Sequence, residues 1–165
     1  MRRLLPVLLL LTPLSLSAET PVSSEASPAG AALQLPEDIR VLLNQEMQAV
    51  RKGMEALVFD VASGNWEAIQ NTGDDIRNSY IMAQHLNESQ RHQLHDALPD
   101  GFKQLDNRFH HYAGMLSHVA EERDIELVHF YIYKMNEACT SCHSRYAQDR
   151  FKAFAAPNRH ERHSH

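Results

Sequence analysis

Cysteine is scarce in this chain: only two occur among 165 residues, and they lie three positions apart. A secreted domain stabilised by disulfides would carry several well-separated cysteines. A disulfide between Cys139 and Cys142 would close almost no loop, so it would restrict the unfolded chain very little. The scarcity therefore excludes a disulfide framework and indicates a different use for the pair.

Long apolar runs are also missing. The one candidate, residues 4–16, follows Arg2 and Arg3, contains two prolines and is too short to span a bilayer comfortably. Small residues follow it up to Ala18. This three-part pattern predicts a secretory signal peptide over residues 1–18, cleaved near Ala18. We therefore expect export to the periplasm without stable membrane insertion.

Basic blocks are absent as well, and no face combines basic with aromatic residues, so nucleic acid is not expected as a partner. Removal of residues 1–18 takes away two arginines and no acid, which changes the net charge from −5 to −7. An acidic balance favours solubility and weak, electrostatically steered contacts with basic partners.

No segment shows the alternation of apolar and polar residues that is typical of strands. Residues 19–35 are rich in Pro, Ser, Ala and Gly, which predicts a flexible leader. The folded domain is expected over residues 36–152. A disordered, His-rich tail is expected over residues 153–165, and it could bind a transition metal weakly.

Four segments carry apolar residues at spacings of three and four, which predicts four helices. The first should span about residues 36–62 and stop at Gly64, and the second should start after Asn65 and reach Ala83. A short helical turn should follow Asn87, and the last two helices should follow Pro99 and Asp124. The economical arrangement is an all-α fold, an antiparallel left-handed four-helix bundle. The residues expected to be buried together are Val50, Leu57, Phe109, Leu116, Val128, Ile132 and Met135.

The motif Cys139-Thr140-Ser141-Cys142-His143 lies in the last of these segments. On a helix, two cysteines at this spacing share a face, where each can add to a vinyl group on one edge of a porphyrin. His143 follows Cys139 by four residues and can therefore reach the iron. Cys-x-x-Cys-His is the signature of haem attachment and predicts one covalently bound haem c per chain. A thioredoxin-like redox pair would need a preceding strand, and no strand is expected before this helix. A structural zinc site would need about four ligands, and only Cys139, Cys142 and His143 cluster here.

This motif, placed on the last of four expected helices, resembles the cytochrome c prime family. The resemblance covers roughly residues 36–151 and is most specific over residues 137–146, with a further match over residues 47–57. It implies His143 as the proximal iron ligand and places Met47 on the opposite side, as a candidate sixth ligand like that of the family's low-spin branch. Leu43 stands where an arginine is usual, and Ala147 where a basic residue is common.

If Arg40 is instead aligned with the arginine that the family usually has in its first helix, Asn44 rather than Met47 takes the position on the distal side of the iron. Four arginines are candidate partners of the haem propionates: Arg40, Arg51, Arg145 and Arg150. Seven histidines fall mostly off the apolar stripes and are expected to be solvated: His85, His92, His95, His110, His111, His118 and His129.

The expected function is that of a periplasmic mono-haem cytochrome that carries single electrons between redox partner proteins. A His/Met ligand pair raises the reduction potential and suits this task, whereas an open iron site suits gas binding. The alternative is therefore a five-coordinate protein that binds nitric oxide or carbon monoxide. A third alternative is a haem-bearing module that docks into a larger complex. The sequence does not decide whether the chain forms a homodimer. No acid/base pair or nucleophile can be placed, so an enzyme is not expected.

Overall fold

The computed structural model describes residues 33–155. Within this range every regular element is a helix, so the expected all-α class is confirmed. The predicted signal peptide, nearly all of the predicted leader and residues 156–165 of the predicted tail lie outside the described residues. The elements are α1 (Glu37–Ser63), α2 (Trp66–Arg77), α3 (Met82–His85), α4 (Glu88–Ala97), α5 (Asp100–Glu121), α6 (Ile125–Tyr146) and the short 3₁₀ helix η1 (Lys152–Phe154).

Local signals explain where the long helices start and end. Gly64 ends α1 with a φ of +67°, a left-handed conformation that glycine adopts without a steric penalty. The side chain of Asn65 then caps α2 by accepting a hydrogen bond from the Ala68 N–H. Asp124 caps α6 in the same way, accepting from the Leu127 N–H at 3.0 Å. These three boundaries agree with the sequence prediction.

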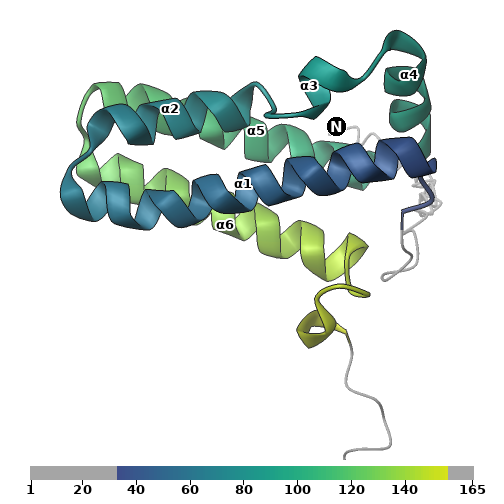
Figure 1. The fold of residues 1–165 in the computed structure, drawn as a ribbon. Coiled ribbons are helices and arrows are strands. Elements are labelled where there is room, and N and C mark those ends of the chain that lie inside the picture. Colours follow the sequence, from purple (N-terminus) through teal and green to yellow (C-terminus); the bar gives the residue numbers. More distant parts are fainter. Residues whose placement is uncertain (1–32, 156–165) are drawn as a thin grey trace, which may run out of the picture.

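Figure 1 shows α1, α2, α5 and α6 as four long helices that lie side by side, with α3 and α4 at the end away from the α1–α2 and α5–α6 turns. The helix α2 packs on α5, α5 packs on α6, and α1 packs on α2, whereas α1 and α6 have much less contact with each other. At Gly73 the backbones of α2 and α5 come so close that a Cβ would lie 2.8 Å from the carbonyl oxygen of Ala113. Glycine is therefore the residue that lets these two helices meet.

The core lies between the four long helices. Six of the seven residues expected in it belong to the buried cluster, and the seventh, Ile132, is half-buried and packs against that cluster. Apolar spacing thus identified the inward face of each long helix, because only one face of each can be removed from water.

The second helix is shorter than predicted. It ends at Arg77, so Tyr80 and Ala83 lie beyond it, and Ala83 belongs to α3 instead. Ser79 has a φ of +62°, which breaks the helix. The N–H groups of Tyr80, Ile81 and Met82 bond to the carboxylate of Glu46 on α1 rather than to carbonyls one turn earlier. A tertiary contact has therefore overridden the local helical pattern.

Candidate functional site

The Cys139–His143 motif lies in the C-terminal part of α6 and is helical throughout. Because a helix turns by about 100° per residue, Cys142 and His143 lie within about 60° of Cys139 around its axis. Cys139 packs against the buried core cluster, and both cysteines are half-buried and free. The structure therefore brings the three residues together on one face of α6, with their side chains partly withdrawn from water.

Burial makes these two thiols hard to ionise. It is the main reason why the pKa of Cys142 is raised to about 11; the negative charge of Asp106 and the neighbouring Cys139 raise this pKa too, and Arg145 lowers it. Burial also raises the pKa of Cys139. Both groups are then protonated thiols at neutral pH. Redox-active cysteines react as thiolates, so these surroundings argue against thiol–disulfide exchange.

His143 is half-buried at the end of the motif. Its ring stacks on that of Phe151, with centroids 4.0 Å apart and planes at 14°. Burial lowers the pKa of His143, and the positive charge of Arg150 lowers it further. The imidazole is therefore neutral at pH 7, and a neutral imidazole has the lone pair that binds a metal.

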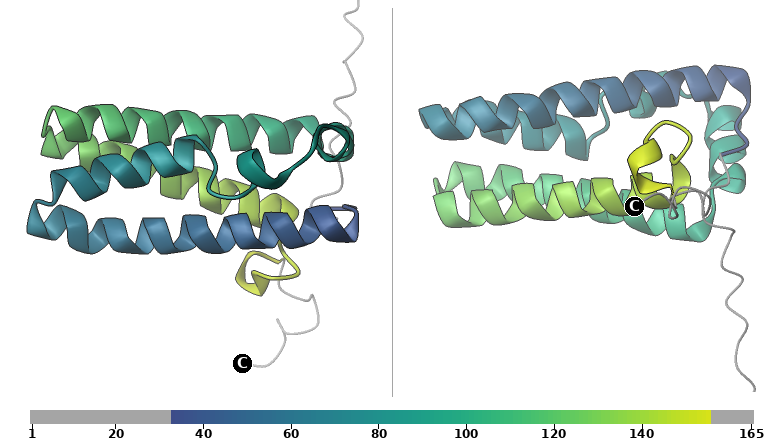
Figure 2. Two further views of the ribbon diagram at one scale, coloured as in Figure 1. Left: turned by 45° about the horizontal axis from the view of Figure 1, so that its top comes forward. Right: turned by 90° about the horizontal axis from the view of Figure 1, so that it is seen from below.

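The short segment after α6 folds back beside α1, as the turned views of Figure 2 show. There the Arg150 guanidinium donates a 2.6 Å hydrogen bond from Nη1 to Oδ1 of Asn44. The next residue, Phe151, stacks on His143. Phe151 thus contacts His143, the predicted proximal ligand, and the preceding residue Arg150 contacts α1.

Met47 lies on α1, three residues after Asn44, and 38% of its side chain is exposed. The structure thus places it on a different helix from the cysteine motif. Leu43, one turn earlier, is half-buried. Asn44, the distal residue in the second alignment with the family, already accepts the bond from Arg150.

The four candidate propionate arginines differ in their present contacts. Arg40 pairs with Glu37, and Arg51 pairs with Glu55 at 2.6 Å. Both are exposed pairs within α1. Arg150 bonds to Asn44, and the charge of Arg145 is close enough to lower the pKa of Cys142. Of the four, Arg145 and Arg150 are those whose charges act on residues of the motif, Cys142 and His143 respectively.

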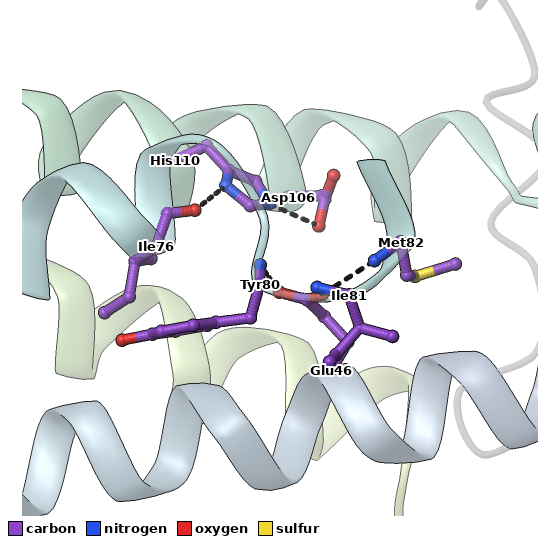
Figure 3. Close-up of polar contacts among 7 residues, drawn as sticks. All are labelled: Glu46, Ile76, Tyr80, Ile81, Met82, Asp106 and His110. Carbon is purple, nitrogen blue, oxygen red and sulfur yellow. Dashed lines mark hydrogen bonds and ion pairs between the residues drawn. The ribbon is translucent and has the colours of Figure 1, made fainter. Parts of the chain in front are cut away.

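A polar cluster that the sequence did not indicate lies between α1, the segment that joins α2 to α3, and α5 (Figure 3). Glu46 is only 3% exposed, and its carboxylate accepts three backbone N–H groups. One signal could have identified it: Glu46 follows Ile39 by seven residues and precedes Val50 by four, so it occupies a core position of α1.

The second part of this cluster centres on His110 of α5. Its Nδ1 lies 2.6 Å from the carbonyl oxygen of Ile76, and its Nε2 lies 3.6 Å from Asp106. Burial acts to lower the pKa of His110. Asp106, the Ile76 carbonyl and the charge of Glu46 outweigh it and raise the pKa above its usual value. His110 is half-buried, whereas the other six histidines named above are exposed as expected.

No cluster of three or more His, Cys, Asp or Glu that could hold a metal ion occurs within residues 33–155. A haem iron needs no such cluster, because the porphyrin supplies four ligands and the protein at most two.

None of the helices in the described part of the chain is long and apolar enough to cross a membrane. No protein-family model, curated protein or solved structure matches this chain.

Proposed function

We propose that this chain is an exported mono-haem c-type cytochrome that carries single electrons between redox proteins in the periplasm. One observation carries the proposal: a single stretch of α6 holds two half-buried, free cysteines and a half-buried histidine on one face. This set of groups suits covalent haem attachment and does not suit thiolate chemistry.

The residues present fit a haem c. Cys139 and Cys142 would hold it through thioether bonds, His143 would bind the iron on the proximal side, and Met47 would complete its coordination. When bound, the haem supplies one-electron redox chemistry. Phe151 restrains the plane of the His143 ring, and the positive charge of Arg150 helps to keep that imidazole unprotonated. With its signal peptide removed the chain is acidic, which suits weak and steered contacts with basic redox partners.

We also propose that α1, α2, α5 and α6 form an antiparallel left-handed four-helix bundle like that of the cytochrome c prime family. The buried cluster draws on all four helices, and each contributes residues at spacings of three and four. A haem attached to α6 would then lie toward α1, the neighbour with which α6 has little direct contact.

One observation favours a second function, the binding of nitric oxide or carbon monoxide at a five-coordinate iron. Leu43 is half-buried one turn before Met47, while the Met47 side chain is more exposed. If Leu43 rather than Met47 faced the iron, the distal side would be apolar and open to a gas.

Covalent attachment is tested by replacing Cys139 and Cys142 together with alanine. We expect the wild type to keep its haem through a denaturing gel and in acidified organic solvent, and the double variant to release it. Thr140→Ala with Ser141→Ala is the matched control, because it changes the same stretch of helix without touching a thiol. Haem that stayed on the cysteine-free chain after denaturation would contradict the proposal.

A further inference from the structure

Glu46 is the most deeply buried acid in the described chain, and its carboxylate is fully engaged (Figure 3). Oε1 accepts from the N–H of Tyr80 at 3.0 Å. Oε2 accepts from the N–H groups of Ile81 at 2.6 Å and Met82 at 3.0 Å. Hydrogen bonds to a charged acceptor are stronger than neutral ones and have fixed directions. The contact therefore fixes this turn of α1 against residues 80–82.

The N-terminal half of α1 has few other attachments. Between Glu37 and Val50 the only buried side chains are Ile39, Glu46 and Val50 itself. Asp38 accepts a hydrogen bond from Gln90 at an exposed site. Glu46 interrupts the apolar stripe of Ile39, Leu43 and Val50, so polar contacts act together with apolar packing in orienting this half of the helix.

On another side of the same turn, Asn44 accepts the hydrogen bond from Arg150. A helix turns by about 100° per residue, so Asn44 and Glu46 point about 160° apart around the axis of α1. Met47 lies about 100° from Glu46 and about 60° from Asn44, on the arc between them. Two contacts on nearly opposite sides of a helix oppose its rotation about its axis. They therefore restrict the direction in which the Cα–Cβ bond of Met47 leaves the helix.

We propose that Glu46 and Asn44 are positioning residues for the distal side of the haem. Glu46 is held by the backbone of residues 80–82 and Asn44 by Arg150, and together they fix the rotation of α1 that directs the Met47 thioether toward the iron. This inference rests on the proposed function, because it assigns a task to residues beside the proposed sixth ligand.

The test compares haem-loaded proteins. Glu46→Gln keeps the shape of the side chain but turns an NH₂ group toward backbone donors, and Asn44→Ala removes the contact on the other side. Gln48→Ala is the matched control, since Gln48 is exposed on the same turn. Met47→Leu shows the spectrum and the carbon monoxide association rate of a protein without the thioether ligand.

We expect both positioning variants to gain a high-spin ferric fraction and to lose part of the sulfur-to-iron charge-transfer band. We expect the reduced Glu46→Gln protein to bind carbon monoxide roughly tenfold faster, which corresponds to about 1.4 kcal/mol of lost positioning. Gln48→Ala should behave as wild type. If Glu46→Gln does not fold, Asn44→Ala decides the question, because it disturbs only a contact near the surface.

Two results would overturn the inference, and they differ. If Met47→Leu changes the iron while Glu46→Gln and Asn44→Ala leave the spectrum and the rate as in wild type, Met47 is the ligand but needs neither positioning contact. If Met47→Leu changes nothing at the iron, the sixth ligand itself is wrong and the positioning role fails with it.

Discussion

Near the α1–α2 and α5–α6 turns, the four long helices meet through Leu57, Ile69, Leu116 and Val128, all of which are fully buried. Toward the other end of these helices, contacts of a different kind are added. There a carboxylate binds three N–H groups, a guanidinium binds an amide, and an imidazole stacks on a phenyl ring. The half with these directional contacts also buries Ile39, Phe102 and Leu105, so it combines apolar packing with directional contacts, whereas the other half is held mainly by apolar packing.

This difference has a consequence for function. Apolar packing is spread over many atoms, so its loss is felt as lost stability. A directional contact involves few atoms, so its loss changes where a helix or ring points more than whether the chain folds. Removing a directional contact near the candidate site should therefore alter its geometry while the apolar core keeps the protein folded.

The largest effect is expected at the packed half. Leu116→Ala removes a fully buried side chain from the core, and we expect it to reduce the free energy of unfolding by about 2–5 kcal/mol. Val41→Ala, at a site that is 43% exposed on the N-terminal half of α1, should cost less than about 0.5 kcal/mol. Urea denaturation of the two variants measures both. Similar losses would show that Leu116 contributes no more to the fold than an exposed side chain does.

A smaller, pH-dependent effect is expected at His110, where the two halves join. Because Asp106, the Ile76 carbonyl and Glu46 raise its pKa in the folded state, the charged ring stabilises the fold. This contribution is fully present below the usual pKa of 6.5 and is lost as the pH rises through the higher folded value. The melting temperature should therefore fall across this range in the wild type.

His110→Gln should lose that part of the pH dependence, whereas the exposed neighbour His111→Gln should keep it. Arg77 and His111 also lie beside His110. Because His110→Gln leaves both of them unchanged, a loss of pH dependence in this variant comes from the His110 ring. Parallel melting curves of the wild type and His110→Gln over the whole range would show that His110 contributes no charge-dependent stability.

The packed half could be predicted from the sequence because its determinants are local. Spacings of three and four marked the inward faces, while Gly64, Asn65 and Asp124 marked helix boundaries. The cysteine motif was equally visible, because its chemistry depends on residues that are adjacent in the chain.

The contacts around the site could not be predicted in this way. Glu46 meets residues 80–82, and Asn44 meets Arg150 more than a hundred positions later. Nothing in the local pattern indicates such pairs. Glu46 also explains the error in the second helix: its carboxylate binds N–H groups that the apolar spacing had assigned to a continuing helix.

A small effect on stability, and the most informative effect at the iron, is expected for Met47→Leu. The two side chains have similar volumes and the site is 38% exposed, so the free energy of unfolding should change by less than about 1.5 kcal/mol. A thioether at the sixth position keeps ferric iron low-spin and slows the entry of other ligands, because the bond must break first. If Met47 is that ligand, the variant turns high-spin, loses the sulfur-to-iron band and binds carbon monoxide faster when reduced.

Optical spectra of the oxidised and reduced proteins, with carbon monoxide kinetics, check this prediction. Met54 provides the control: it lies two turns further along α1 and packs against the core cluster, so Met54→Leu should leave the iron unchanged. A wild type that is already high-spin at neutral pH, and that Met47→Leu does not alter, would make Met47 an ordinary side chain of α1. The gas-binding function would then be the better account of this protein. The directional contacts on α1 would then shape an open distal side, in which Leu43, half-buried one turn earlier, sets the crowding that an entering gas meets.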